Sequence, residues 1–162
     1  MKTKKGFTLI ELLLYVVIVS MMLGALLPFM FEIMSGSVQS STEQDVVSTA
    51  RLISERIKVE IRKAKSIQSL TAGSLTLQNI SGPDTTIDLL NGNVRLDRGT
   101  GAVSLNPPST VVTDLTFANY SSADLKTKHV KFNLTVRSLL TTGRQEYQRQ
   151  VALESSEEIR NN

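Results

Sequence analysis

The chain of 162 residues is long enough for one ordinary domain with an appended segment, and too short for two full domains. It contains no cysteine, which excludes disulfides, thiolate metal sites and thiol catalysis. Lys2, Lys4 and Lys5 supply three of the 18 basic residues, and the rest of the chain has 15 basic and 15 acidic residues. The net charge of +3 therefore reflects a basic start of the chain, and it does not indicate a broad cationic face for nucleic acid.

The first predicted element is an apolar helix. Residues 12–31 contain no charged side chain. As a helix, this segment rises by about 1.5 Å per residue and spans roughly 30 Å, the thickness of a bilayer's hydrocarbon core. We expect the basic residues before it to hold the N-terminus in the cytoplasm, so that the C-terminal part crosses the membrane. An ordinary secretory signal has a shorter apolar core with a small-residue cleavage site behind it, and the sequence shows no such site.

Glu11 is a carboxylate at the start of this apolar stretch. An ionised acid costs on the order of 2–3 kcal/mol at the centre of a membrane span, and less near its end. The side chain could extend toward the lipid head groups, or it could pair with a cation from another chain. A plain membrane anchor does not explain the residue, so we expect a partner for it.

The sequence GFTLIELL, from Gly6 to Leu13, closely resembles the processing and assembly motif of type IV prepilins and pseudopilins. The resemblance implies that a prepilin peptidase, which is also the N-methyltransferase, cuts between Gly6 and Phe7 and methylates the new amine of Phe7. A side chain in place of Gly6 would obstruct the approach of the protease. The resemblance also implies that Glu11 neutralises the terminal amine of a neighbouring subunit during assembly, and that Pro28 corresponds to a proline that kinks pilin helices.

Three parts are expected from this resemblance. Residues 1–6 form a leader peptide, residues 7–34 a transmembrane and assembly helix, and residues 35–162 an amphipathic helix followed by a globular β-sheet domain. The protein is expected in the cytoplasmic (inner) membrane as a single-pass protein with its N-terminus inside, and then in an extracytoplasmic filament. The implied partners are the peptidase, other pilin or pseudopilin subunits, the inner-membrane assembly platform and membrane lipid, with no direct nucleic-acid binding.

An amphipathic helical pattern follows the apolar segment. Apolar residues recur at steps of three and four, which places them on one helical face; they are Val46, Ala50, Ile53, Ile57, Ile61 and Ala64. On the charged opposite face, Arg51 and Glu55 have the spacing of an ion pair across one turn. We predict one long helix over about residues 8–66, softened or interrupted near Gly36, whose apolar stripe packs on a sheet.

From Ser74 onward, apolar residues alternate with polar ones, as is typical of strands. The inward positions are expected at Leu75, Leu77, Ile87, Leu89, Val94, Leu96, Val103, Leu105, Leu115, Phe117, Val130, Phe132, Leu134, Val136, Tyr147, Val151 and Leu153. Asn91-Gly92 predicts a hairpin turn, and Thr142-Gly143 predicts a second turn. One apolar face suits an antiparallel sheet that is covered on one side. The predicted fold class is α+β, with a long N-terminal helix packed on a mainly antiparallel sheet, as in pilins.

The C-terminal half more loosely resembles the J-type minor pseudopilins of type II secretion and the W-type minor pilins. This resemblance rests on the helix over residues 51–66, the hairpin at residues 91–95 and the strand at residues 111–117. It implies a minor structural subunit of a type IV pilus or of a type II secretion pseudopilus. Two alternatives stay open: a competence pseudopilus subunit for DNA uptake, and an extracytoplasmic binding module on a signal anchor.

No residue pattern in the sequence points to catalysis. His129 follows Lys128 and has no acidic neighbour in sequence. The aspartates are scattered, whereas a calcium loop needs several oxygen ligands at close spacing. The glycine-containing segment 97–101 lacks the lysine and the following helix of a phosphate-binding loop. We therefore expect no enzyme activity, no catalytic residue, no cofactor and no metal site.

Overall fold

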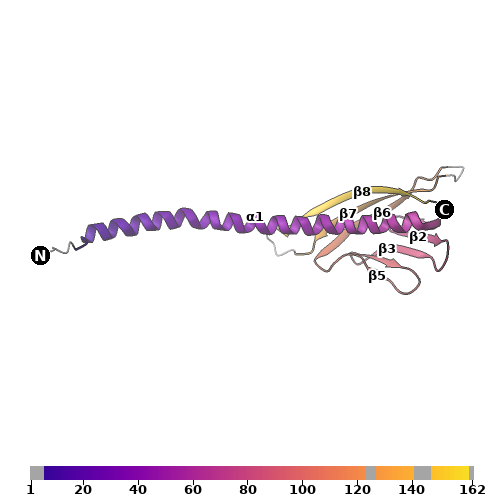
Figure 1. Cartoon of the computed structure of the whole chain (residues 1–162), viewed down its shortest axis with the longest axis horizontal. Coiled ribbons are helices and arrows are strands. Elements are labelled where there is room, and N and C mark those ends of the chain that lie inside the picture. The colour runs from indigo at the N-terminus through magenta and orange to yellow at the C-terminus, as the bar shows by residue number, and fades with distance from the viewer. Residues whose placement is uncertain (1–5, 123–126, 141–146, 161–162) are drawn as a thin grey trace. The chain divides into compact units, whose positions relative to one another are not determined.

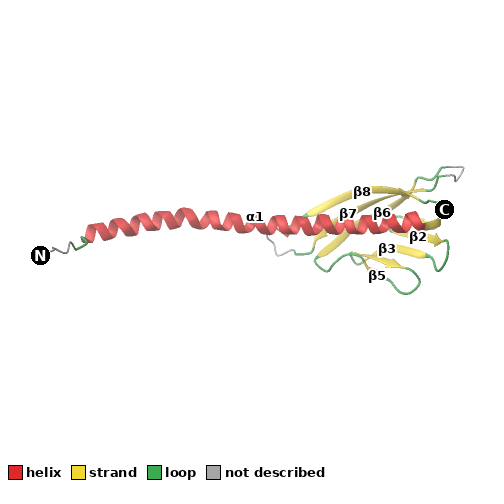
Figure 2. Cartoon of the chain, in the orientation of Figure 1, coloured by secondary structure: helices red, strands yellow, loops and turns green. Residues whose placement is uncertain are grey.

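The computed structural model describes residues 6–122, 127–140 and 147–160. Within these ranges one helix precedes eight strands, and every strand pairing is antiparallel (Figure 2). The elements are α1 (Leu9–Lys63), β1 (Ala64–Thr71), β2 (Ser74–Asn79), β3 (Thr85–Leu90), β4 (Asn93–Asp97), β5 (Val103–Ser104), β6 (Thr110–Asn119), β7 (His129–Ser138) and β8 (Gln150–Glu158). The predicted α+β class, a long N-terminal helix followed by antiparallel strands, is confirmed.

The chain forms two compact units, residues 1–38 and residues 39–162. In the first unit, the side chains of residues 6–34 are all exposed. The α1 helix is long and apolar enough, by length and composition, to cross a membrane. It also continues without a break through Gly36, which confirms the predicted continuation of the helix and shows no interruption at that residue. A Cβ atom at Gly36 would meet no heavy atom within 4 Å, and the glycine therefore relieves no crowding within the chain.

The core of the second unit is built on the apolar stripe of α1. The predicted stripe residues Val46, Ala50, Ile53, Ile57 and Ile61 are fully buried. They join buried residues from both sheets in one cluster, which includes Leu75, Leu77, Ile87, Val94, Val112, Leu115, Phe117, Val130, Phe132, Leu134 and Val136. In Figure 1 this part of α1 lies beside the strands, with β6–β8 on one side and β2, β3 and β5 on the other. The stripe therefore covers the sheets, as the sequence periodicity predicts.

The larger sheet has the strand order β1-β2-β3-β4-β5. Its β3–β4 hairpin is closed by Asn91 and Gly92, whose φ angles are 52° and 77°. Two successive positive φ angles are the requirement of a type I′ turn, so the predicted Asn-Gly hairpin is confirmed. Gly92 is also constrained by packing, because a Cβ atom there would lie 2.3 Å from Cγ2 of Val111.

The smaller sheet has the strand order β6-β7-β8. The hairpin tips of the larger sheet meet β6 through backbone hydrogen bonds. The N–H of Phe117 donates to the carbonyl of Ala72 at 3.1 Å, and the N–H of Val112 donates to the carbonyl of Gly92 at 2.9 Å. The strand pattern therefore forms two sheets, which are joined where the turns of one contact the first strand of the other.

Several element boundaries differ from those predicted. The α1 helix ends at Lys63, and residues 64–71 form strand β1, because Ala64 and the residues after it pair with β2. Ala64 is fully buried, as predicted, but it is a strand residue. Val103 is 64% exposed and does not join the core, since β5 is a two-residue edge strand. Tyr147 precedes β8, and the predicted Thr142-Gly143 turn lies outside the described residues.

The predicted ion pair between Arg51 and Glu55 does not form. Glu55 instead accepts a hydrogen bond from Lys58 at 3.0 Å, one turn further along α1. The residues three and four positions from Glu55 compete for the same carboxylate, and sequence spacing alone does not decide between them.

Candidate functional site

The N-terminal segment holds the residues that the sequence motif singles out. Gly6, Phe7 and Thr8 precede α1, and Thr8 caps it. The N–H of Glu11 lies 3.1 Å from the carbonyl oxygen of Thr8 and 3.4 Å from its side-chain oxygen Oγ1. A threonine at the N-cap with a glutamate three residues later is the sequence pattern of a capping box. The helix therefore begins directly after the predicted cleavage site, and Thr8 is a helix cap that sequence reasoning missed.

The predicted cleavage site is accessible. Gly6 and Phe7 are both exposed, and Phe7 is 73% exposed. A Cβ atom at Gly6 would meet no heavy atom within 4 Å. Packing inside the chain therefore does not require glycine at this position. The expected reason for the glycine is that a processing enzyme must approach the backbone here. The Phe7 ring lies edge-on to the ring of Tyr15, with centroids 6.3 Å apart and planes at 61°.

Glu11 lies in the first turn of α1 and is exposed. The positive end of the helix dipole favours a carboxylate at this position, which gives the residue a local role besides the predicted assembly role. Its carboxylate forms no ion pair with any residue in the described ranges 6–122, 127–140 and 147–160. The helix dipole therefore favours an acid at this position. Because it has no ion-pair partner in the described ranges, the carboxylate can pair with a cation from another chain.

Two residues in the apolar part of α1 affect the hydrogen bonding of backbone carbonyl groups. Ser20 donates its hydroxyl hydrogen to the carbonyl of Val16 at 2.7 Å, which satisfies this polar group inside the helix itself. Pro28 lies within α1 and has no N–H to donate to the carbonyl of Gly24. Internal satisfaction of polar groups is what a lipid environment requires of a helix. The kink predicted at Pro28 stays a prediction.

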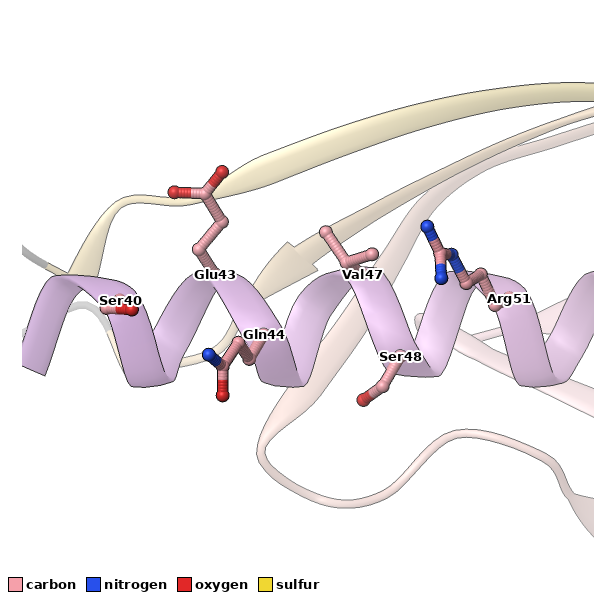
Figure 3. A pocket seen from close by; sticks show the side chains of 6 residues that line it. All are labelled: Ser40, Glu43, Gln44, Val47, Ser48 and Arg51. Atoms are coloured by element: carbon pink, nitrogen blue, oxygen red, sulfur yellow. The ribbon is translucent and has the colours of Figure 1, made fainter.

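A hollow of about 600 Å³ follows one side of α1 in the second unit. In Figure 3, the side chains of Glu43, Val47 and Arg51 point toward the top of the view. Those of Gln44 and Ser48 point toward the bottom. All its described lining residues come from α1: Ser40, Glu43, Gln44, Val47, Ser48 and Arg51. The alternation of small polar and charged groups offers no nucleophile–base pair and no cluster of converging ligands.

An ionic cluster around the buried Glu60 holds the end of α1 against the β4–β5 loop. Glu60 is only 5% exposed, and its carboxylate accepts two hydrogen bonds from the guanidinium of Arg98. The Nε atom of Arg56 lies 3.5 Å from the same carboxylate. Sequence reasoning read segment 97–101 only as a polar turn, because a partner 38 residues away is not visible from local spacing. The carboxylate is fully paired, which indicates a structural tie rather than a reactive acid.

No group of His, Asp and Glu residues in the described ranges has the arrangement of a metal site. The described acids are instead distributed between surface positions and ion pairs such as Arg95–Asp88 and Arg62–Glu157.

Comparisons with known proteins find one similarity. Residues 1–27 match the profile of the prokaryotic N-terminal methylation motif. Neither the curated proteins nor the solved structures include a significant match to the chain. The motif match covers Gly6, Phe7 and Glu11, and it includes most of the exposed apolar part of α1. Together, the motif and the helix support a place for this chain in the superfamily of type IV pilins and pseudopilins.

Proposed function

We propose that this chain is a minor structural subunit of a type IV pilus or type II secretion pseudopilus. In this proposal the peptidase removes residues 1–6 and methylates the amine of Phe7. Residues 7–34 then anchor the mature chain in the inner membrane and pack it into the filament, and residues 35–162 form the globular part. The observation that carries the proposal is the methylation motif at residues 1–27, which continues into an exposed apolar helix.

Assembly is assigned to the pairing of Glu11 with the Phe7 amine of a neighbouring subunit. Both groups lie at the start of an apolar segment, where an unpaired carboxylate and an unpaired ammonium are each unfavourable. Bringing them together removes both penalties at once. The partners that follow are other pilin or pseudopilin subunits and the inner-membrane assembly platform, and the role requires no enzyme activity or cofactor.

Within this function we assign the chain to the J-type minor pseudopilins or the W-type minor pilins. The loose sequence pattern described above is the support for this choice. In the structure, Arg95 of its hairpin segment forms an ion pair with Asp88 across the β3–β4 hairpin, with 2.9 Å between Nε and Oδ1. That arginine therefore also has a role inside the fold.

Mass spectrometry of the chain from cells that carry a prepilin peptidase tests processing. We expect a mature chain that begins at methylated Phe7. Gly6→Val should block cleavage, because its side chain obstructs access to the scissile peptide bond, and Gly24→Val provides a control for a bulkier residue in the helix α1 that follows. Both glycines have open space at the Cβ position, so packing against the rest of the chain does not distinguish them. A wild-type chain that keeps Met1 and an unmethylated Phe7 would contradict the proposal.

Replacement of Glu11 separates a filament subunit from an anchored binding module. Glu11→Ala should leave the chain in the membrane fraction but reduce its recovery in sheared filaments at least tenfold, since the partner amine loses its counter-charge. Glu32→Ala removes another exposed acid from the same helix and serves as the control. Equal filament recovery for wild type and Glu11→Ala would favour the anchored module over the subunit.

A further inference from the structure

Strand β8 is the outer strand of the smaller sheet and pairs on one side only, with β7. The N–H of Ile159 donates to the carbonyl of Lys128 at 2.9 Å. At the other end, the N–H of Ser138 donates to the carbonyl of Arg149 at 3.0 Å. In an antiparallel pair, residues bonded in this way alternate with residues whose backbone groups point away from the partner strand. The residues of β8 with outward N–H and C=O groups are therefore Gln150, Ala152, Glu154, Ser156 and Glu158.

The other edge strands of the described part of the chain are protected against pairing with another protein. Strand β5 has only two residues. Strands β1 and β6 contain register shifts, and β6 also donates hydrogen bonds to the hairpin tips of the larger sheet. By contrast, β8 has nine residues in unbroken register with β7, and it contains no proline and no glycine. A long and regular edge of this kind is one to which an extended segment can add as a further strand.

One face of β8 would gain apolar contacts from an added strand. Val151 packs against the core of the second unit, and Leu153 lies on the same face two residues later. Both side chains are only partly buried. Toward an added strand, both residues would belong to non-hydrogen-bonded pairs, in which the side chains of neighbouring strands lie closest. Apolar residues at the facing positions would therefore cover Val151 and Leu153.

The other face of β8 selects the charge of the added strand. Its exposed side chains include two acids, Glu154 and Glu158, and no base. Glu154 forms an ion pair with Lys131, whereas Glu158 forms none within the described ranges. Opposite charges at facing positions stabilise two paired strands, and like charges destabilise them. The edge therefore favours a strand that carries Lys or Arg.

The same charges disfavour a second copy of β8 as the added strand. In the antiparallel register that uses all the outward residues, Glu154 of one copy would face Glu154 of the other. No residue from Gln150 to Glu158 supplies a base to offset this repulsion. The edge therefore discriminates between a second copy and a basic segment of a different protein.

We propose that a strand of a different filament subunit extends the smaller sheet at β8. In that strand, apolar residues face Val151 and Leu153, and they alternate with Lys or Arg residues that face Glu154 and Glu158. This inference rests on the proposed filament function and assigns a contact to the globular part, separate from the pairing of Glu11 with Phe7. Because the added strand belongs to a different chain, the contact does not repeat as an array of copies, as suits a minor subunit.

Photocrosslinking in purified filaments tests the contact. A benzoylphenylalanine replaces Ala152 in the full chain, which is expressed with a prepilin peptidase and the other filament subunits. Irradiation should join the chain to a different subunit. Mass spectrometry of the crosslinked peptides should place the crosslink in a segment where apolar residues alternate with Lys or Arg. A product composed of two copies of this chain would overturn the choice of a different subunit.

A pair of proline variants tests the backbone hydrogen bonds in the crosslinking background. Ser156→Pro removes an outward N–H of β8, and an edge strand tolerates proline at such a position. We expect at least a tenfold loss of crosslinked product, with thermal unfolding that matches the parent chain. Ser104→Pro is the matched control, because Ser104 likewise directs its N–H away from its sheet, on the short edge strand β5. Equal loss of product for the two variants would contradict pairing at β8.

Charge reversal provides a second test that does not depend on proline. Glu158→Lys should reduce the crosslinked product at least tenfold, because it places a base opposite the basic residues of the added strand. Asp114→Lys changes an exposed acid of β6 in the same sheet, and it should leave the product unchanged. An unchanged product for Glu158→Lys would overturn the basic character of the partner.

The outcomes separate this inference from the proposed function. A processed chain that is recovered in filaments but gives no crosslink from position 152 overturns the added strand and leaves the filament function intact. A chain that is neither cleaved nor recovered in filaments overturns the proposed function and this inference with it.

Discussion

At the scale of single residues, the chain combines positions whose chemistry is local with positions that local sequence cannot explain. The Asn91-Gly92 turn is readable from two letters, because only residues that tolerate positive φ close such a hairpin. Glu60 is different, since its partner Arg98 lies on a loop far along the chain. Sequence spacing indicates which groups can meet across one helical turn, and it does not indicate which groups the fold brings together.

Removal of Arg98 should destabilise the globular unit. Arg98→Ala leaves the Glu60 carboxylate buried with only the longer contact to Arg56, and we expect a loss of about 2–3 kcal/mol in the free energy of unfolding. Arg98 itself is half-exposed, which places the expected loss toward the low end for buried pairs. Denaturant unfolding of the detergent-solubilised chain, followed by circular dichroism, measures it.

The double variant Arg98→Ala/Glu60→Gln should recover part of that loss, because the neutral amide no longer requires a cation. Arg51→Ala is the control, because Arg51 lies on α1 with Glu60, is exposed, and forms no ion pair in the described residues. This change should alter the free energy of unfolding by less than about 0.5 kcal/mol. Equal effects of Arg98→Ala and Arg51→Ala would contradict the structural role of the cluster.

At the scale of elements, periodicity predicted the helix stripe and most of the strands, and it failed where pairing decided the outcome. The stripe from Val46 to Ile61 is buried as predicted. Strand β1 was missed because its residues continue a plausible helix, and only pairing with β2 turns them into a strand. Val103 alternates like a core residue but lies on a two-residue edge strand, where nothing covers it.

The contact between α1 and β8 should depend on pH. The hydrogen-bonded Arg62 guanidinium lowers the pKa of Glu157 below its usual 4.5. A carboxylate with a lowered pKa in the folded state contributes stability above its unfolded pKa, and this contribution is lost as the pH falls through the folded value. Wild type should therefore exceed Glu157→Gln in melting temperature at pH 7, and the difference should shrink below about pH 4. A difference that stays constant from pH 7 to pH 3 would show that the pair is not its source.

Pro28 should bend the apolar part of α1. Spin labels at Met21→Cys and Ser37→Cys are separated by roughly 24 Å in a straight helix. We expect a shorter mean separation with Pro28 than with Pro28→Ala, because the proline removes one backbone hydrogen bond and crowds the preceding turn. Leu26→Ala in the labelled chain controls for loss of an apolar side chain. Identical distance distributions for Pro28 and Pro28→Ala would rule out a kink.

At the scale of the whole molecule, the N-terminal segment says most about function, and its structure is the simplest, a single helix. The fold class followed from two periodicities, one of helix and one of strand. The candidate site followed from the short segment Gly6–Leu13, whose residues make few contacts within the chain. Thr8 was missed as the helix cap, although the Thr-x-x-Glu spacing was available.

The most direct test is the density of filaments purified from cells that express the chain, at a resolution that shows side chains. We expect the carboxylate of Glu11 to lie within about 4 Å of the methylated amine of Phe7 from a neighbouring subunit. A Glu11 carboxylate that faces lipid or solvent in the assembled filament, with no amine beside it, would rule out the proposed pairing.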